Sequence, residues 1–294
     1  MDSAIPVIIN PASGPRTAVL AEINRVFRKA GVHWSVEITQ EPGDATRLAA
    51  KLAAQGTPIV AAYGGDGTIS EVACGLSGTQ TALGLLPGGT ANVLAFEFCV
   101  PRNLVQAAHL LISEHAIRVV DVGDVDGRKF LLRAGAGLEA AAVGRAPREL
   151  KDLFGLLAYG IAGLQALLEI SPVTYNLELD GKPAHARGIL CTVANAAHLG
   201  ILPALTLKPA IDITDGLLDV VVIDRVDLQN MIALLTRNLN SRDSLGGLQH
   251  WQVHHAVIQA DPPQTTQVDG DSLGHTPIAV RSLPQALRVV VPRF

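Results

Sequence analysis

The chain has 294 residues, of which 48% are hydrophobic and 17% are charged, and its net charge is −4 at pH 7. This composition excludes a chain that is disordered throughout, and the length is sufficient for two ordinary domains. The sequence has no block of Lys or Arg, which argues against a nucleic-acid partner because a phosphate backbone requires a basic face. Three scattered cysteines without a CxxC spacing indicate neither a disulfide framework nor a zinc site.

The sequence predicts a cytoplasmic protein without a membrane span. An acid at position 2 and the lack of a basic segment after it argue against a signal peptide. The apolar run 154–168 is shorter than the roughly 20 residues that a spanning helix needs. This run is either a buried core helix or a helix beside a lipid-chain pocket or the bilayer surface, and composition does not decide between them.

Residues 1–120 are expected to form an α/β domain. Apolar runs predict strands at 5–9, 33–39, 59–63 and 83–86, and helical spacing predicts helices at 19–30, 45–53, 68–76 and 91–98. Thr68 with Glu71 three residues later matches a capping box, so we expect the third helix to begin at Thr68. Repeated strand–helix units predict a parallel sheet covered by helices on both faces.

Residues 121–294 have the pattern of a mostly antiparallel β-sandwich. Strands are expected at 119–125, 129–134, 173–179, 189–194, 218–223, 253–260 and 287–291, with helices near 149–169 and 228–239. Asp126-Gly127 and Asp180-Gly181 lie between strand pairs and are typical of hairpin turns. The last strand is a candidate to return to the first domain.

Three polar, glycine-rich turns follow expected strands of the first domain. They are Asn10–Gly14, Gly64–Thr68 and Pro87–Asn92. Ligands of open parallel sheets bind beyond the carboxyl ends of the strands, and glycines allow an anion to approach backbone N–H groups. None of the turns matches GxxxxGK[ST] or a true GxGxxG, and each alone is more typical of a plain strand–helix connection. Together they favour a nucleotide.

Asp66 is the acid of the second turn. Beside phosphates it would repel them unless a cation or a proton intervened. It is therefore a candidate partner of Mg²⁺, directly or through water, or a group that orients an attacking hydroxyl. The structural alternative is an Asx turn that stabilises the loop.

The motifs, taken in order, resemble those of the diacylglycerol kinase catalytic-domain family, which includes sphingosine kinases and bacterial lipid kinases. The resemblance rests on INPASG, ITQEPGDA, GGDGTISEVACGL, LGLLPGGTANVLA, VVDVG, DITDGLLDVVVI and VDGD. GGDGT alone is shared with NAD kinases and phosphofructokinases, whereas the ordered set spans nearly the whole chain and is specific.

The resemblance implies an ATP site and a structural Mg²⁺ site. The implied ATP-binding residues are Asn10, Pro11, Ala12, Ser13, Gly14, Thr39, Gly64, Gly65, Asp66, Gly67, Thr68, Ile69, Ser70 and Thr90, with Asn92 bracing the third loop. The implied Mg²⁺ ligands are the Asp215 carboxylate and the main-chain oxygens of Asp212 and Leu217. Without the family, Asp215-Gly216 would be interpreted as an ordinary hairpin turn.

The resemblance also implies a proton acceptor. The family usually has Glu in a D-G-E motif, and this chain has Asp269-Gly270-Asp271. Asp271 is one methylene shorter, so Asp269 is a second candidate for the role. Asp66 is the third catalytic candidate, and Asp121 matches an acid of the active-site water network. Val93 and the segment 195–204 depart from the family pattern.

These observations lead to the hypothesis of an ATP- and Mg²⁺-dependent lipid kinase. Diacylglycerol, converted to phosphatidic acid, is the expected substrate, and a sphingoid base or another lipid is the alternative. The enzyme would visit the membrane surface as a peripheral protein, with the run 156–168 as an apolar wall for the lipid. The sequence leaves a homodimer open. A soluble NAD-kinase-like enzyme and a non-catalytic protein that binds lipid or nucleotide are the rival hypotheses.

Overall fold

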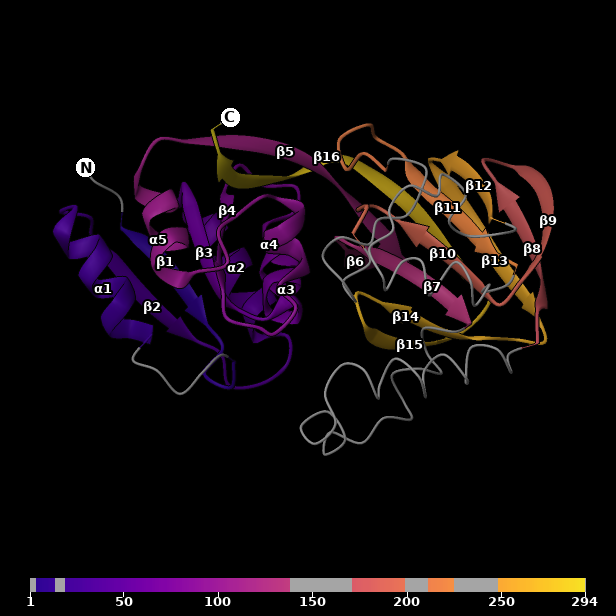
Figure 1. The fold of residues 1–294 in the computed structure, drawn as a ribbon, viewed down its shortest axis with the longest axis horizontal. Coiled ribbons are helices and arrows are strands. Elements are labelled where there is room, and N and C mark those ends of the chain that lie inside the picture. Colours follow the sequence, from indigo (N-terminus) through magenta and orange to yellow (C-terminus); the bar gives the residue numbers. More distant parts are fainter. Residues whose placement is uncertain (1–3, 14–18, 138–170, 199–210, 225–247, 294) are drawn as a thin grey trace, which may run out of the picture.

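The computed structural model describes residues 4–13, 19–137, 171–198, 211–224 and 248–293, and these form an α/β half beside a β-rich half (Figure 1). The α/β half contains β1 (Ile5–Ile9), α1 (Val19–Lys29), β2 (Trp34–Ile38), α2 (Asp44–Ala54), β3 (Ile59–Gly64), α3 (Asp66–Leu76), β4 (Ala82–Pro87), α4 (Val93–Glu97) and α5 (Leu104–Ile112). The predicted fold class is confirmed. The expected helices at 149–169 and 228–239, and the run 154–168, lie outside the described residues.

The β-rich half is built from twelve further strands, two of which also reach the α/β half. These strands are β5 (His115–Val125), β6 (Arg128–Phe130), β7 (Arg133–Gly137), β8 (Val173–Leu179), β9 (Lys182–Gly188), β10 (Leu190–Ala194), β11 (Leu218–Ile223), β12 (Leu248–Val253), β13 (His255–Asp261), β14 (Thr265–Val268), β15 (Asp271–His275) and β16 (Ile278–Pro292). Among the helices that the structure describes, none has the length and apolar character needed to cross a membrane.

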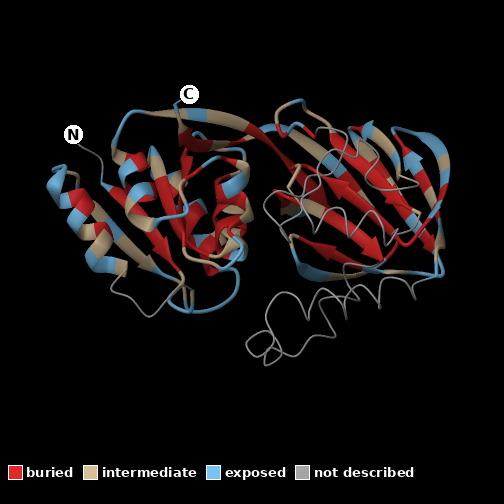
Figure 2. Ribbon diagram, in the orientation of Figure 1, coloured by how far each residue is buried: buried red, intermediate tan, exposed pale blue. Residues whose placement is uncertain are grey.

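The α/β half is organised around four parallel strands in the order β2-β1-β3-β4. The β1-α1-β2 unit steps along the sheet in one direction, and the next two units step in the other. Because such crossovers are right-handed, α1 lies on the opposite face from α2 and α3. Helices on both faces explain why β1, β3 and β4 are almost entirely buried (Figure 2).

The β-rich half contains a second, wholly antiparallel sheet in the order β12-β11-β10-β7-β14-β15. Its inward side chains pack against β8 and β13 in a shared apolar core. The two predicted hairpin turns are confirmed, since both residues of Asp126-Gly127 and of Asp180-Gly181 have positive φ. A third turn of this kind, Asp269-Gly270, has φ values of 47° and 91° and connects β14 to β15.

The two halves are joined by the long strands β5 and β16, which pair with each other in antiparallel register. The first part of β16 pairs with β13, and its last part pairs in parallel with β4 through Arg288 and Val289. The C-terminal segment therefore completes the sheet of the first half. This shared sheet fixes the α/β half relative to the β-rich half.

Two local expectations are wrong. Helix α3 begins at Asp66 with Gly65 at the N-cap position, so the Thr68–Glu71 capping box does not form. Thr68 instead accepts a hydrogen bond from Asn10, and the Glu71 carboxylate accepts one from the Gly43 amide. The helix starts early because Asp66 and Gly67 already have helical geometry after the extended Gly65.

The expected strand at 129–134 is also divided into β6 and β7. The division occurs because the amides of Leu131 and Leu132 donate to the Asp269 carboxylate instead of to a neighbouring strand. A helix that the sequence did not predict, α5, follows α4 after a short connection.

Candidate functional site

The three glycine-rich loops lie together at the carboxyl ends of β1, β3 and β4. The Asn10 amide donates to the Tyr63 carbonyl at 3.1 Å, and the Gly88 amide donates to the Gly64 carbonyl at 2.8 Å. These bonds continue the sheet for one residue beyond the strands and hold the loops next to each other. The arrangement matches the position at which open parallel sheets bind ligands.

The second and third loops approach so closely that only glycine fits at position 89. A Cβ atom added to Gly89 would lie 2.7 Å from the Gly65 Cα atom. Asn92, with φ of 51°, accepts from the Gly89 amide at 2.9 Å and donates to the Gly89 carbonyl at 2.7 Å. This is the bracing of the third loop that was expected of Asn92.

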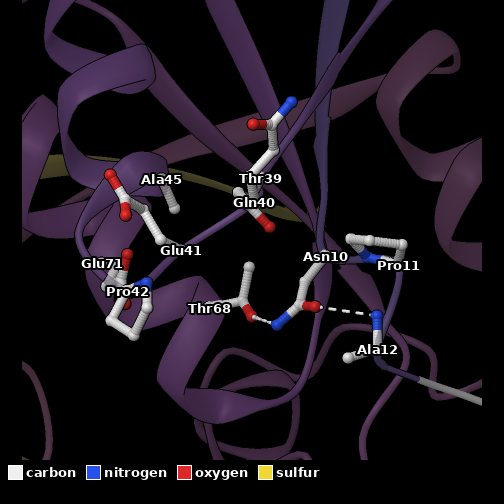
Figure 3. Close-up of a pocket in the computed structure, with 10 residues that line it drawn as sticks. All are labelled: Asn10, Pro11, Ala12, Thr39, Gln40, Glu41, Pro42, Ala45, Thr68 and Glu71. Carbon is white, nitrogen blue, oxygen red and sulfur yellow. Dashed lines mark hydrogen bonds between the residues drawn. The ribbon is translucent and has the colours of Figure 1, made fainter.

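A pocket of about 270 Å³ opens between the first loop, the end of β2 and the start of α3 (Figure 3). Five predicted nucleotide residues line it: Asn10, Pro11, Ala12, Thr39 and Thr68. The Asn10 side chain accepts from the Ala12 amide at 2.9 Å and donates to Thr68 Oγ1 at 3.0 Å. Asn10 therefore ties the first loop to α3 at the pocket wall.

Five further residues line the pocket although the sequence did not mark them as nucleotide contacts. They are Gln40, Glu41, Pro42, Ala45 and Glu71. The first four lie in and just after the turn that follows β2. The signal that could have identified them is a polar turn at a strand end beside Thr39, which is the same signal that marked the other loops.

Several other predicted nucleotide residues do not line this pocket. Gly64, Gly65, Asp66, Gly67 and Thr90 lie in or beside the second and third loops but do not line this pocket. The Ile69 side chain is fully buried in the core of the α/β half. Ser13 follows the pocket residues directly in the first loop, and Gly14 lies outside the described residues.

Asp66 links the second loop to α4. It is the first residue of α3, and its Oδ1 atom accepts a hydrogen bond from the Leu94 amide at 3.0 Å. A carboxylate in the first turn of a helix is favoured by the helix dipole. The side chain is half-buried, so Asp66 combines a structural contact with access to solvent at the loop.

Asp269 is enclosed by four hydrogen-bond donors. Its carboxylate accepts from the amides of Leu131, Leu132 and Arg133 at 2.9, 2.9 and 3.0 Å, and from Ser70 Oγ at 3.1 Å. Burial raises the pKa of Asp269, and the four donors oppose this rise because they favour the ionised carboxylate. Since Ser70 belongs to α3, Asp269 connects α3 to the β-rich half.

Asp271, two residues later, has the opposite environment. Its side chain is 73% exposed, and Oδ2 accepts from Arg128 Nη2 at 2.6 Å. It is the first residue of β15, directly after the Asp269-Gly270 turn. The two acids of the D-G-D motif are therefore distinguished by structure: Asp269 is half-buried and connects the two halves, and Asp271 is accessible.

Asp121 is a fully buried carboxylate at the junction of the two halves. Oδ2 accepts from the Gly216 amide at 2.6 Å, and Oδ1 accepts from the Gln285 amide at 2.7 Å. The Asp121 amide donates to the Ile213 carbonyl at 2.8 Å. Asp121 thereby fixes the 212–217 loop against β5 and β16.

The 212–217 loop offers oxygen ligands of the kind that Mg²⁺ prefers. The Asp215 carboxylate accepts from the Leu217 amide at 2.9 Å and from Gln252 Nε2 at 3.2 Å. Nearby, the buried Oδ2 atom of Asp219 has no hydrogen-bond partner within the described part of the chain. Burial and then the charge of Asp215 raise the pKa of Asp219, whereas His250 lowers it. A carboxylate oxygen that accepts no hydrogen bond from the described residues and lies close to a second acid can serve as a ligand of a cation.

The described residues contain no cluster of acidic, histidine or cysteine side chains typical of a metal site. No group of three or more His, Cys, Asp or Glu side chains among them has the geometry to hold a metal ion. The Asp212 carboxylate accepts hydrogen bonds from the amide and hydroxyl of Thr214. Its main-chain oxygen, the predicted ligand, accepts one from the Asp215 amide at 3.3 Å and has a second lone pair for a cation. The donor set fits Mg²⁺ in chemical type, and the three ligands named from the sequence remain a prediction.

Comparison with known proteins agrees with this arrangement. Residues 4–125 match the model of the diacylglycerol kinase catalytic domain, and residues 133–291 match that of the YegS C-terminal NAD kinase beta sandwich-like domain. The chain belongs to the diacylglycerol kinase catalytic-domain family. The resemblance seen in the sequence is thereby confirmed.

Three similar proteins have names of different precision. A diacylglycerol kinase of Bacillus subtilis is 29% identical over 98% of this chain and 96% of its own length. A protein of Chromohalobacter salexigens named probable lipid kinase YegS-like is 30% identical over 97% and 92%. An uncharacterized protein of Synechocystis sp. is 32% identical over 81% of this chain, which spans only 56% of that relative.

Solved structures share the fold of the whole chain. The crystal structure of a diacylglycerol kinase from Bacillus anthracis str. Sterne superposes with a TM-score of 0.79 at 25% identity, covering 98% of this chain and 97% of that one. The pairing of a parallel α/β half with an antiparallel β-rich half is therefore the arrangement of this family.

The contact between Gly65 and Gly89 leads to a first prediction. Gly89→Ala should force the second and third loops apart and lower the melting temperature, because the added Cβ would lie 2.7 Å from backbone. Gly67→Ala is the matched control, since a Cβ there meets nothing within 4 Å. Thermal unfolding of both variants makes the comparison, and equal melting temperatures would contradict the proposed tight contact.

The two acids of the D-G-D motif lead to a second prediction. Asp269→Asn should lower the free energy of unfolding by about 1–3 kcal/mol. The NH₂ group of asparagine cannot accept the hydrogen bonds that one carboxylate oxygen accepts, so two donors lose their acceptor. Asp271→Asn, at an exposed position, should change it by less than about 0.5 kcal/mol. Urea unfolding of both variants tests this contrast, and it fails if the two losses are equal.

Proposed function

We propose that the protein transfers the γ-phosphate of ATP to the hydroxyl of a lipid, and that the lipid is diacylglycerol. Membership of a kinase family implies ATP as phosphate donor. Two of the similar proteins are named diacylglycerol kinase and probable lipid kinase, which supports a lipid acceptor. The observation that carries the proposal is the Ser70–Asp269 bond, which holds the D-G-D turn, and with it the start of the strand that carries Asp271, against helix α3.

The nucleotide is proposed to bind with its phosphates at the three loops and its remaining part in the pocket near Asn10 and Thr39. The described lining residues include the carboxylates of Glu41 and Glu71 and no Lys or Arg. These carboxylates adjoin the first loop and would repel a bare polyphosphate bound at the loops, so the ATP is proposed to bind with Mg²⁺. When bound, Mg²⁺ supplies positive charge that offsets the charge of the phosphates.

Phosphoryl transfer requires a base, a fixed acceptor and an exclusion of water. Asp271 is proposed to accept the proton of the attacking lipid hydroxyl as its oxygen bonds to the γ-phosphorus and the bond to ADP breaks. Asp269 is unsuited to this task, because each of its two carboxylate oxygens already accepts two hydrogen bonds that hold it in place. Asp66 is proposed to orient the phosphate-bound cation or the hydroxyl.

A structural Mg²⁺ is also proposed at the 212–217 loop, with the Asp215 carboxylate and the main-chain oxygens of Asp212 and Leu217 as ligands. Asp219 Oδ2, which has no hydrogen-bond partner among the described residues, supports a cation in this region. The acceptor lipid is proposed to reach the enzyme from a membrane surface to which the protein binds peripherally.

The proposal predicts transfer of labelled phosphate from ATP to a lipid. A panel of diacylglycerol, a sphingoid base and NAD, each supplied with ATP and Mg²⁺, separates the candidates in one experiment. Label should appear in phosphatidic acid and be lost when a chelator removes the metal. Label in NAD alone would favour a soluble NAD-kinase-like enzyme, and binding of nucleotide without label in any acceptor would favour a non-catalytic protein.

A further inference from the structure

Asp271 is held by one side chain from a neighbouring hairpin. Arg128 Nη2 donates to Asp271 Oδ2 at 2.6 Å. Arg128 is the first residue after the Asp126-Gly127 turn, and Asp271 is the first residue after the Asp269-Gly270 turn. The two side chains therefore leave from equivalent positions of two tight turns that lie next to each other.

The backbones of these two hairpins are already fixed to each other. Asp269, in the second turn, accepts hydrogen bonds from the amides of residues 131–133, which directly follow the strand that begins at Arg128. The Asp269 amide also donates to the Arg133 carbonyl at 2.9 Å. With both backbones held, the main freedom left to the Asp271 carboxylate is rotation about its own two side-chain torsions.

The Arg128–Asp271 pair cannot be explained as a source of stability. The Arg128 side chain is 42% exposed and the Asp271 side chain 73% exposed. Exposed ion pairs contribute little to folding, because water screens the attraction and two side chains lose rotational freedom. The consequence of the pair is the direction in which the Asp271 carboxylate points.

We infer that Arg128 is a positioning residue for Asp271, an assignment that rests on the proposed function. Arginine stays protonated in proteins, so Arg128 supplies direction and charge without competing for the substrate proton. Within the described part of the chain, no group donates to Asp271 Oδ1. The contact at Oδ2 therefore leaves Oδ1 to accept the proton of the attacking hydroxyl.

Lys129 provides a matched control. It is the next residue in the same strand, so its side chain lies on the other face. Its Nζ atom donates to the Cys74 carbonyl at 3.5 Å and not to Asp271. Lys129→Gln removes the same charge from the same short strand without removing the contact to Asp271.

The test is steady-state kinetics with ATP and 1,2-dioctanoylglycerol in mixed micelles. Arg128→Gln should lower kcat about tenfold, with the KM for ATP changed less than about twofold, because the loss is one of orientation. Arg128→Lys should restore most of kcat, and Lys129→Gln should match the wild type. Asp271→Asn should lower kcat roughly 10²–10⁴-fold. Adding Arg128→Gln to it should cause no further loss.

The outcomes separate this role from the proposed function. Wild-type transfer with an unchanged Arg128→Gln variant would overturn the positioning role alone. So would an equal loss in the Asp271→Asn background, or a rise in the KM for ATP at constant kcat, which would indicate a phosphate contact instead. No transfer by the wild type to any lipid would overturn the proposed function and the role of Arg128 with it. Equal melting temperatures of wild type and Arg128→Gln confirm that folding is not the cause.

Discussion

The structure of the candidate site depends on the carboxylate of Asp269. Three backbone amides and the Ser70 hydroxyl surround it, and Ser70 belongs to the helix that carries the second glycine-rich loop. Burying a charge is costly unless its hydrogen bonds are all supplied. Charge-assisted bonds contribute about 1.5–3 kcal/mol each, so four of them can offset that cost. One side chain thus fixes the accessible hairpin, the divided strands β6 and β7, and helix α3 relative to one another.

A second set of contacts prepares the nucleotide side of the site. These contacts are the close approach of Gly89 to Gly65, the Asn92 brace and the bond from the Leu94 amide to Asp66. They hold the second and third loops together, and a site whose parts are held in place loses less entropy when the proposed nucleotide binds. At the junction of the two halves, Asp121 holds the 212–217 loop to β5 and β16 in a comparable way.

Local patterns were sufficient to predict the fold class and the three loops, because strand–helix alternation and glycine turns are properties of short segments. They were insufficient wherever a distant residue changed a local choice. Asp269 divides a strand that the sequence predicts as continuous from 129 to 134. The Thr68 hydroxyl, which the sequence predicts as a helix cap, instead accepts a hydrogen bond from Asn10. Ser70 and Asp269 are 199 residues apart, so no local pattern could show their contact. The environments of Asp269 and Asp271 also differ because of contacts with residues distant in the sequence, Ser70 and Leu131 for Asp269 and Arg128 for Asp271.

The most direct test of this account is the kinetic effect of Ser70→Ala. The substitution removes the hydroxyl that joins α3 to Asp269 and keeps the three amide bonds within the β-rich half. If Asp269 couples the two halves, kcat for lipid phosphorylation should fall while the KM for ATP stays within about twofold of the wild type, because only transition-state alignment is lost. An unchanged kcat with a raised KM for ATP would show that Ser70 serves the nucleotide alone, and it would contradict the coupling.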